Sequence, residues 1–296
     1  MNSVQTLSLD LAALVEAVGT GVVRVEARRR AGSGVVWAPD GVIVTADHVI
    51  EWEEGIHVGL PSGDTVQASL VGRDPRTDVA VLRAEATGLA PIPWAPPDDL
   101  RVGHLLVAVG RPGRTVRAAF GVVGALGSMS PARAGRGADT YLEADLSAVP
   151  GFSGGALVDA GGKARALTTT GLRPRGISGV TLPALRRVVD ALLTDGRIRR
   201  AYLGVGTQPV RLPAPLARRA NQEEGLLIVG VETESPAERA GLLLGDTIVA
   251  LAGEPIRGVR ELLARLGEAQ IGASVPVRIL RGGEARDHTI TVGERR

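Results

Sequence analysis

The 296-residue sequence predicts a mostly β fold, in which a pair of antiparallel β-barrels precedes a smaller α+β unit. Three observations lead to this fold class. Short runs rich in valine recur through the first two thirds of the chain, and turn signals separate them. Glycine and proline are abundant, at 40 and 18 residues, as turn-rich β structure requires. No long helical pattern separates the runs, so a parallel sheet with crossover helices is not expected.

The first elements follow in chain order from residue spacing. Apolar residues recur at helical intervals over residues 7–18, and Ser8 and Asp10 are candidate starts, which predicts a leading helix within the N-terminal segment 1–20. From residue 21 the pattern changes to strands. The predicted strands of the barrel domain, residues 21–183, are 22–25, 34–37, 42–44, 79–82, 102–109, 115–123, 156–158, 164–170 and 177–182.

A second, smaller unit is expected after residue 200. Residues 185–193 predict an amphipathic helix that Asp195-Gly196 closes, and a basic stretch follows, so we assign residues 184–200 to a linker helix and hinge. The features of the unit over residues 201–296 are the segments 225–229, 235–241 and 245–249, a predicted helix near 259–266, and a final pair of predicted strands around 276–280 and 289–292.

The composition limits the possible partners and cofactors. Hydrophobic residues make up 44% of the chain, while Trp, Tyr and Phe number only 3, 2 and 2, so the core must be aliphatic. The net charge is +2, and the densest basic run, residues 28–30, has no interleaved aromatics, so no nucleic-acid partner is expected. The absence of cysteine rules out disulfides, thiolate metal sites and a cysteine nucleophile.

The N-terminal residues do not resemble an export signal. They lack a basic start, Asp10 and Glu16 interrupt the apolar stretch, and no window reaches the ~20 apolar residues that a spanning helix needs. We therefore expect no membrane span and, for the chain as written, a cytoplasmic location. An extracytoplasmic location remains open if the N-terminus has been trimmed.

Three short motifs carry the chemistry. Ser153 lies within Gly151-Phe152-Ser153-Gly154-Gly155, His48 follows the strand 42–44, and Asp78 precedes the strand 79–82. A serine hydroxyl needs an imidazole to accept its proton, and the imidazole needs a carboxylate to orient it. The order His, Asp, Ser therefore predicts nucleophilic catalysis, with the N–H groups of Gly151 and Ser153 as oxyanion donors.

Other interpretations of these residues are weaker. The serine motif also matches the nucleophile elbow of α/β-hydrolases, but a turn at residues 159–162 follows and only His288 comes later. Asp74 competes with Asp78 for the orienting role, and His57, His104 and His288 are expected to be structural. No phosphate loop or zinc-ligand spacing is present, so no metal or other cofactor is expected.

The chain resembles the HtrA/Deg family of serine proteases from residue 21 to its C-terminus. The motifs that carry the resemblance lie at residues 32–35, 39–49, 74–82, 150–157 and 202–205. The resemblance implies a chymotrypsin-like double β-barrel protease domain followed by a small PDZ domain. It places His48, Asp78 and Ser153 in the catalytic triad and Gly151 and Ser153 in the oxyanion hole.

The resemblance also implies a function. It predicts an ATP-independent serine endopeptidase that cleaves unfolded or damaged proteins in protein quality control. The PDZ domain is expected to bind peptide C-termini, with Leu203, Gly204, Val205 and Gly206 as the carboxylate-binding loop beside the helix 259–266.

Two departures from the family pattern leave a second interpretation open. Phe152 stands where the family has Asn, and Ala156 where it has Pro. A bulky Phe152 that twists the Gly151 peptide out of the site would give a weakly active or inactive protease fold that acts as a peptide-binding or chaperone module.

Specificity and assembly follow from two further positions. Ser147 occupies the position at which an acid selects Arg or Lys in trypsin-like relatives, so we expect a preference for small or medium aliphatic residues, in a pocket bounded by residues 147–150 and 172–180. Family members form trimers through N-terminal aromatics. No aromatic residue precedes Trp37, which argues against a trimer of that kind and leaves a homo-oligomer as an open alternative.

Overall fold

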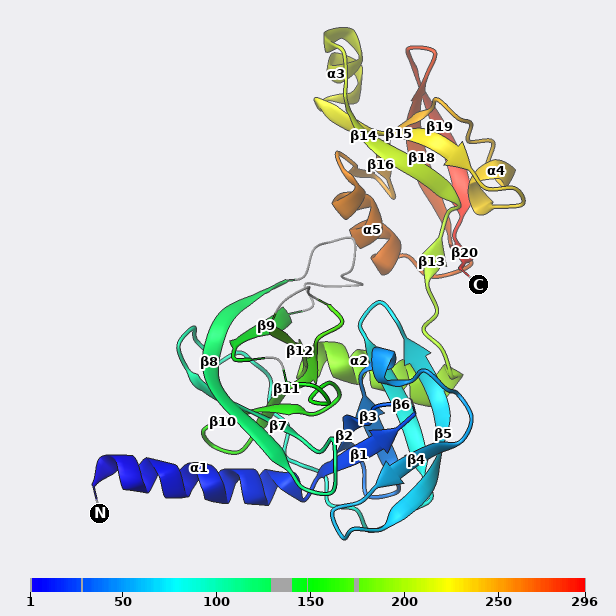
Figure 1. Cartoon of the computed structure of the whole chain (residues 1–296). Helices are drawn as coiled ribbons and strands as arrows, with labels where there is room; N and C mark the ends of the chain where they lie inside the picture. Colours follow the sequence, from blue (N-terminus) through cyan, green and yellow to red (C-terminus); the bar gives the residue numbers. More distant parts are fainter. Residues whose placement is uncertain (1, 28, 129–139, 148, 173–175, 296) are drawn as a thin grey trace. The chain divides into compact units, whose positions relative to one another are not determined.

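The computed structural model describes residues 2–27, 29–128, 140–147, 149–172 and 176–295 (Figure 1). The described residues form two compact units, the first ending at Ile198 and the second beginning at Arg199. No helix in the described ranges is long and apolar enough to cross a membrane. Arg28 of the basic run, and residues 148 and 173–175 of the expected specificity pocket, lie outside the described residues.

The leading helix α1 spans Ser3–Gly19, so it begins four residues earlier than the apolar spacing predicts. Its cap is Asn2, whose side chain accepts a hydrogen bond from the Gln5 amide at 2.9 Å, while the Gln5 side chain accepts one from the Asn2 amide at 3.1 Å. This reciprocal capping box satisfies two N–H groups that the helix leaves unpaired, and it makes Asn2 a better start than Ser8 or Asp10.

The first barrel is closed by six antiparallel strands in the order β1-β2-β3-β6-β5-β4. Valine and isoleucine side chains from these strands fill its interior, among them Val25, Ile43 and Ile56. The strands are β1 (Val22–Glu26), β2 (Gly32–Val36), β3 (Val42–Thr45), β4 (Ile56–Gly59), β5 (Thr65–Asp74) and β6 (Val79–Ala84), with a 3-10 helix η1 (Asp47–Val49) after β3.

A second closed barrel follows, in the order β10-β11-β12-β9-β8-β7. Its interior contains Leu106, Leu142 and Leu157. The strands are β7 (Leu105–Gly110), β8 (Arg117–Ser128), β9 (Thr140–Asp145), β10 (Ala156–Asp159), β11 (Ala164–Thr169) and β12 (Ile177–Thr181). The predicted mostly β double barrel is thereby confirmed.

Helix α2 (Leu182–Asp195) belongs to the first unit, because it packs on strands of both barrels. Leu185, Val188 and Leu192 on its apolar side are buried in the core that the two barrels share. It ends at Gly196, whose φ of +69° is the left-handed conformation that favours glycine. Most of the residues predicted as a linker, 184–200, therefore lie in this helix and contribute to the barrel core.

The second unit has a sheet in the order β14-β15-β16-β18-β19, with β14 at one edge. Its separate core includes Leu226, Ile248 and Val277. The strands are β13 (Ala201–Tyr202), β14 (Val205–Arg211), β15 (Glu224–Val231), β16 (Thr247–Leu251), β17 (Glu254–Pro255), β18 (Ser274–Arg281), β19 (Glu284–Thr291) and β20 (Gly293–Glu294), and the helices are α3 (Ala214–Ala220), α4 (Pro236–Arg239) and α5 (Val259–Glu268).

Candidate active site

His48 and Asp78 form a hydrogen-bonded pair at one end of the first barrel. His48 lies in η1, directly after β3, and Asp78 immediately precedes β6, which is the neighbour of β3 in the barrel. The imidazole Nδ1 lies 2.9 Å from Oδ1 and 2.8 Å from Oδ2 of Asp78. Because a carboxylate only accepts hydrogen bonds, Nδ1 carries the proton and Nε2 is the nitrogen able to accept one.

The backbone around Asp78 holds this pair in place. Asp78 is only 4% exposed, and its φ of +57° is unusual for a residue other than glycine. Its Oδ1 also accepts the backbone N–H of His48 at 2.9 Å. The carboxylate therefore orients both the backbone and the ring of His48.

Ser153 lies on the loop that enters β10 of the second barrel. Gly154, with a φ of +84°, follows it, and a side chain there would overlap the Ser33 carbonyl and the Thr45 hydroxyl of the first barrel. The loop can therefore lie directly against β2 and β3. The Ser153 hydroxyl forms a hydrogen bond of 3.0 Å with the Thr170 hydroxyl.

Three consecutive threonines, the last two residues of β11 and the one that follows it, connect the serine loop to the His48–Asp78 pair. Thr168 donates its hydroxyl to the Phe152 carbonyl, Thr169 donates to Asp78 Oδ2, and Thr170 contacts Ser153. Alternate side chains of a strand point to opposite sides, so Thr168 and Thr170 face the serine loop and Thr169 faces Asp78. Sequence reasoning missed these roles, although a run of three hydroxyl residues ending a predicted strand was a usable signal.

Gly171 continues this wall of the site. An added Cβ would lie 2.8 Å from Asp78 Oδ2 and 2.9 Å from His48 Nδ1, which is closer than real Cβ atoms approach such groups. The bare backbone of Gly171 therefore packs directly against the carboxylate–imidazole pair.

The two predicted oxyanion donors are available. Neither the Gly151 nor the Ser153 N–H has a hydrogen-bond partner among the residues that the structure describes. The Phe152 carbonyl accepts from the Gly155 N–H at 2.9 Å and from Thr168. Since the C=O and N–H of one peptide unit point in opposite directions, this carbonyl orients the Ser153 N–H away from the barrel wall.

Phe152 does not occupy the site. Its side chain is 1% exposed and lies in the interior of the second barrel with Leu106 and Leu157. It packs on Gly110, where any side chain would overlap its ring. The bulk that departs from the family pattern is therefore accommodated by the barrel core.

The competing residues are used elsewhere. Asp74 accepts hydrogen bonds from the Thr77 hydroxyl at 2.8 Å and the Arg76 amide at 3.2 Å, so it shapes the turn that leads to Asp78. His57 Nδ1 lies 2.9 Å from the Gly55 carbonyl, and His288 Nδ1 lies 2.9 Å from the Ala240 carbonyl of the second unit. His104 Nδ1 accepts the Arg101 amide at 3.3 Å.

In the second unit, the predicted carboxylate loop leads into the edge strand β14. The Leu203 carbonyl accepts the Ala237 N–H at 2.8 Å, and the Gly204 carbonyl accepts the Glu232 N–H at 2.9 Å. The Gly204 N–H belongs to the same peptide unit as the Leu203 carbonyl, so it points in the opposite direction, away from Ala237. Gly204 has a φ of +82°, and any side chain there would overlap Ser235. Val205 and Gly206 begin β14 itself.

Comparison with known proteins gives the same two-part division. Residues 32–167 match the family described as "Trypsin-like peptidase domain", and residues 201–292 match "PDZ domain". The serine endoprotease DegS of Escherichia coli K12 is 32% identical over 284 residues, which are 90% of this chain and 77% of DegS. A probable periplasmic serine endoprotease, DegP-like, of Halomonas elongata is 32% identical over 278 residues, or 91% of this chain.

Solved structures show the same similarity. The HtrA-type protease AlgW with decapeptide has a TM-score of 0.80 at 25% identity, covering 96% of this chain and 98% of that one. The serine endoprotease from Yersinia pestis has a TM-score of 0.79 at 29% identity, covering 96% and 98%. The chain spans only 57% of the Halomonas elongata relative and 53% of its Rhizobium meliloti counterpart, little more than half the length of these curated relatives.

Proposed function

Because the chain belongs to the HtrA/Deg family of trypsin-like serine proteases with a PDZ domain, we propose that it is a serine endopeptidase that cleaves unfolded or damaged proteins. The observation that carries the proposal is the hydrogen bond of His48 to the buried Asp78 carboxylate, beside the Ser153 loop. In this proposal Ser153 is the nucleophile, His48 the general base and Asp78 the residue that orients the imidazole.

The first chemical step is acylation. The Ser153 hydroxyl leaves Thr170, transfers its proton to Nε2 of His48, and its oxygen attacks the carbonyl carbon of the scissile peptide bond. Asp78 stabilises the imidazolium that forms, without taking up a proton itself. The oxyanion of the tetrahedral intermediate accepts hydrogen bonds from the N–H groups of Gly151 and Ser153.

The intermediate then collapses. His48 returns the proton to the leaving amine, the C–N bond breaks, and the C-terminal fragment leaves as that amine, while an ester links the N-terminal fragment to Ser153. Water hydrolyses this ester after giving a proton to His48, and the released Ser153 recovers that proton. No group beyond this chain and water is needed for the cycle to balance.

Labelling with a fluorophosphonate tests the assignment, since the reagent phosphonylates only an activated serine. We expect wild type to be labelled at Ser153 and to cleave reduced casein, and Ser153→Ala and His48→Ala to do neither. Labelling of Ser153→Ala, or an unlabelled wild type across pH 6–9 with and without C-terminal peptides, would refute the proposal.

For the second unit we propose capture of peptide C-termini. A peptide would add as a strand to the free edge of β14, and the loop Leu203, Gly204, Val205 and Gly206 would hold its carboxylate. Fluorescence polarisation with a peptide and its C-terminal amide tests this. We expect the amide to bind at least tenfold more weakly, and equal binding would contradict the proposal.

A peptide-binding module without proteolysis is the second candidate. Phe152 is the residue that suggests it, but the burial of that side chain in the barrel core removes the reason to expect a distorted site. Comparison of wild type with Ser153→Ala on an aggregating unfolded protein separates the two functions. Equal suppression of aggregation without cleavage would favour the module.

Substrate preference, location and assembly remain predictions. We propose a preference for small or medium aliphatic residues before the cleaved bond, to be read from peptide-library cleavage. The word "periplasmic" in the names of the DegP-like relatives supports an extracytoplasmic location, which a fusion of the complete gene to alkaline phosphatase would test. Light scattering would show whether the chain forms a homo-oligomer.

A further inference from the structure

Ser33, at the start of β2 in the first barrel, holds both sides of the serine loop from the second barrel. It is fully buried. Its hydroxyl lies 2.6 Å from the Gly151 carbonyl, and its backbone N–H donates to the Ser153 carbonyl at 3.0 Å. One residue thereby contacts the carbonyls on either side of Phe152.

The direction of the Ser33–Gly151 bond is determined by a third contact. The Ser33 oxygen accepts the backbone N–H of Arg111 at 2.8 Å, and a backbone N–H can only donate. The Ser33 proton is therefore free to be donated to the Gly151 carbonyl. Thr45 fixes Ser33 in turn, because its hydroxyl donates to the Ser33 carbonyl at 2.7 Å.

Gly151 is the residue of the loop that most needs such a restraint. Its φ of +88° is accessible to glycine, and glycine also has the widest choice of other backbone conformations. Its own N–H is one of the two oxyanion donors. Ser33 holds the Gly151 carbonyl. The Phe152 N–H belongs to the same peptide unit as that carbonyl, and it donates to the Val149 carbonyl at 3.2 Å.

From these contacts we propose that Ser33 is a positioning residue of the oxyanion hole: its hydroxyl selects the one Gly151 conformation in which the Gly151 and Ser153 N–H groups converge. The proposal rests on the proposed protease function. Ser33 touches neither substrate nor the reacting atoms, so its effect reaches the reaction through Gly151. A misplacement of about 1 Å at such a donor is enough to slow an enzyme about 100-fold.

Substitution of Ser33 by alanine removes the hydroxyl and keeps the backbone bond to Ser153. We expect Ser33→Ala to lower the rate of acylation by a p-nitrophenyl ester about 10- to 100-fold with little change in KM. We expect the acylation rate of Ser33→Cys, whose thiol is a weaker donor, to lie between the rates of wild type and Ser33→Ala. A peptide boronic acid, which binds as a tetrahedral adduct with an oxygen in the hole, should lose affinity by a similar factor.

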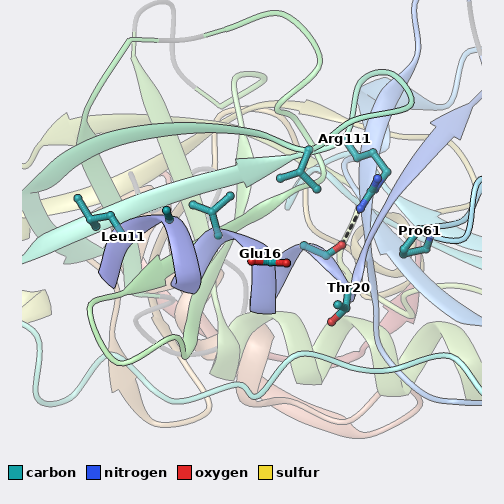
Figure 2. A pocket seen from close by; sticks show the side chains of 9 residues that line it. Leu11, Glu16, Thr20, Pro61 and Arg111 are labelled. Atoms are coloured by element: carbon teal, nitrogen blue, oxygen red, sulfur yellow. Dashed lines mark hydrogen bonds between the residues drawn. The ribbon is translucent and has the colours of Figure 1, made fainter. Parts of the chain in front are cut away.

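Arg111 provides a matched control for a general loss of structure. Its guanidinium donates to the Gly19 carbonyl at the end of α1 at 2.8 Å, a bond drawn in Figure 2, and to the Val22 carbonyl at 2.7 Å. Arg111→Met removes these bonds but keeps the backbone N–H that Ser33 accepts. We expect Arg111→Met to lower the melting temperature and loosen α1, while its acylation rate stays within about twofold of the wild-type rate.

The outcomes separate the positioning role from the proposed function. If wild type is labelled by a fluorophosphonate and Ser33→Ala acylates and binds the boronate as wild type does, the positioning role is wrong and the protease assignment stands. If Arg111→Met slows acylation as much as Ser33→Ala, the Ser33 effect is a general loss of structure and the role is again wrong. An unlabelled wild type would refute the protease assignment itself.

Discussion

At the scale of single residues, the position of Gly151 requires glycine for two reasons. Its backbone is in the left-handed region, and an added Cβ would overlap the Pro112 side chain. We expect Gly151→Ala to lower turnover about 100- to 1000-fold, the effect of losing one oxyanion donor. Steady-state kinetics with a p-nitrophenyl ester would measure this, and circular dichroism should show an unchanged fold. Activity within threefold of wild type would contradict it.

Thr169 is the second residue whose loss has a defined result. Its hydroxyl donates to Asp78 Oδ2 and accepts the Gly171 N–H at 3.0 Å. Thr169→Val has nearly the same shape but leaves that carboxylate oxygen without one of its donors, so we expect kcat/KM to fall about tenfold. Thr169→Ser, which keeps the hydroxyl, is the control and should stay near wild type. If both variants fall equally, the methyl group matters and the hydrogen bond does not.

The sequence predicts some of these residue roles and conceals others. His48, Asp78 and Ser153 stand in short motifs, so the order and spacing of the residues are enough to predict that they act together. The roles of Ser33 and the threonines 168–170 are hidden, because hydroxyl and β-branched residues are common in ordinary strands. Their roles depend on which carbonyl or carboxylate the opposite barrel brings within hydrogen-bonding distance, and only the folded chain supplies that.

At the scale of elements, an ion pair joins β16 to β18 in the second unit. Asp246, which precedes β16, accepts two hydrogen bonds of 2.6 Å from Arg281 at the end of β18, and its Oδ2 also accepts the Leu243 amide at 2.7 Å. Burial acts to raise the pKa of the Asp246 carboxyl. The Arg281 hydrogen bonds and charge, with the Leu243 bond, outweigh it and lower the pKa below the usual 3.8.

A pH-dependent stability follows from this lowered pKa. The folded carboxyl holds its proton less tightly than the unfolded one, so the ion pair stabilises the unit above about pH 4, and that stability disappears as the pH falls through the folded value. We expect Asp246→Asn to cost about 2 kcal/mol at pH 7 and much less near pH 2.5. Urea unfolding followed in the second unit at both pH values would test this. A pH-independent difference would contradict it.

The strands that the sequence predicts most accurately are continuous apolar runs, and several strands interrupted by polar residues are missed. β3 and β6 are continuous apolar runs, and the sequence predicts both within two residues. β5 is missed, because its ten residues mix exposed and buried positions and include Gln67, Ser69 and Arg73. β4, which His57 interrupts, and β9, which includes Glu143, are also missed, and it is barrel closure that pairs them. Helix α1 begins early because its start is a side-chain cap, which the apolar spacing does not reveal.

At the scale of the whole molecule, the two units have separate hydrophobic cores. Residues of the barrel cores end at Ile198, and the core of the second unit begins with Ala201. Cores that share no side chains unfold independently, so we expect calorimetry of the full chain to show two transitions. Asp246→Asn should shift one of them and Arg111→Met the other. A single transition that both variants shift would show that the units unfold together.

The Phe152 anchor has a further consequence. A loop tied to its barrel by a buried aromatic ring responds to solvent conditions differently from a loop tied by an ion pair: apolar attraction weakens near freezing and is strengthened by sulfate, while added salt screens charges. Catalysis by this chain should therefore decline in the cold more steeply than its chemistry alone requires, and ammonium sulfate should partly restore it.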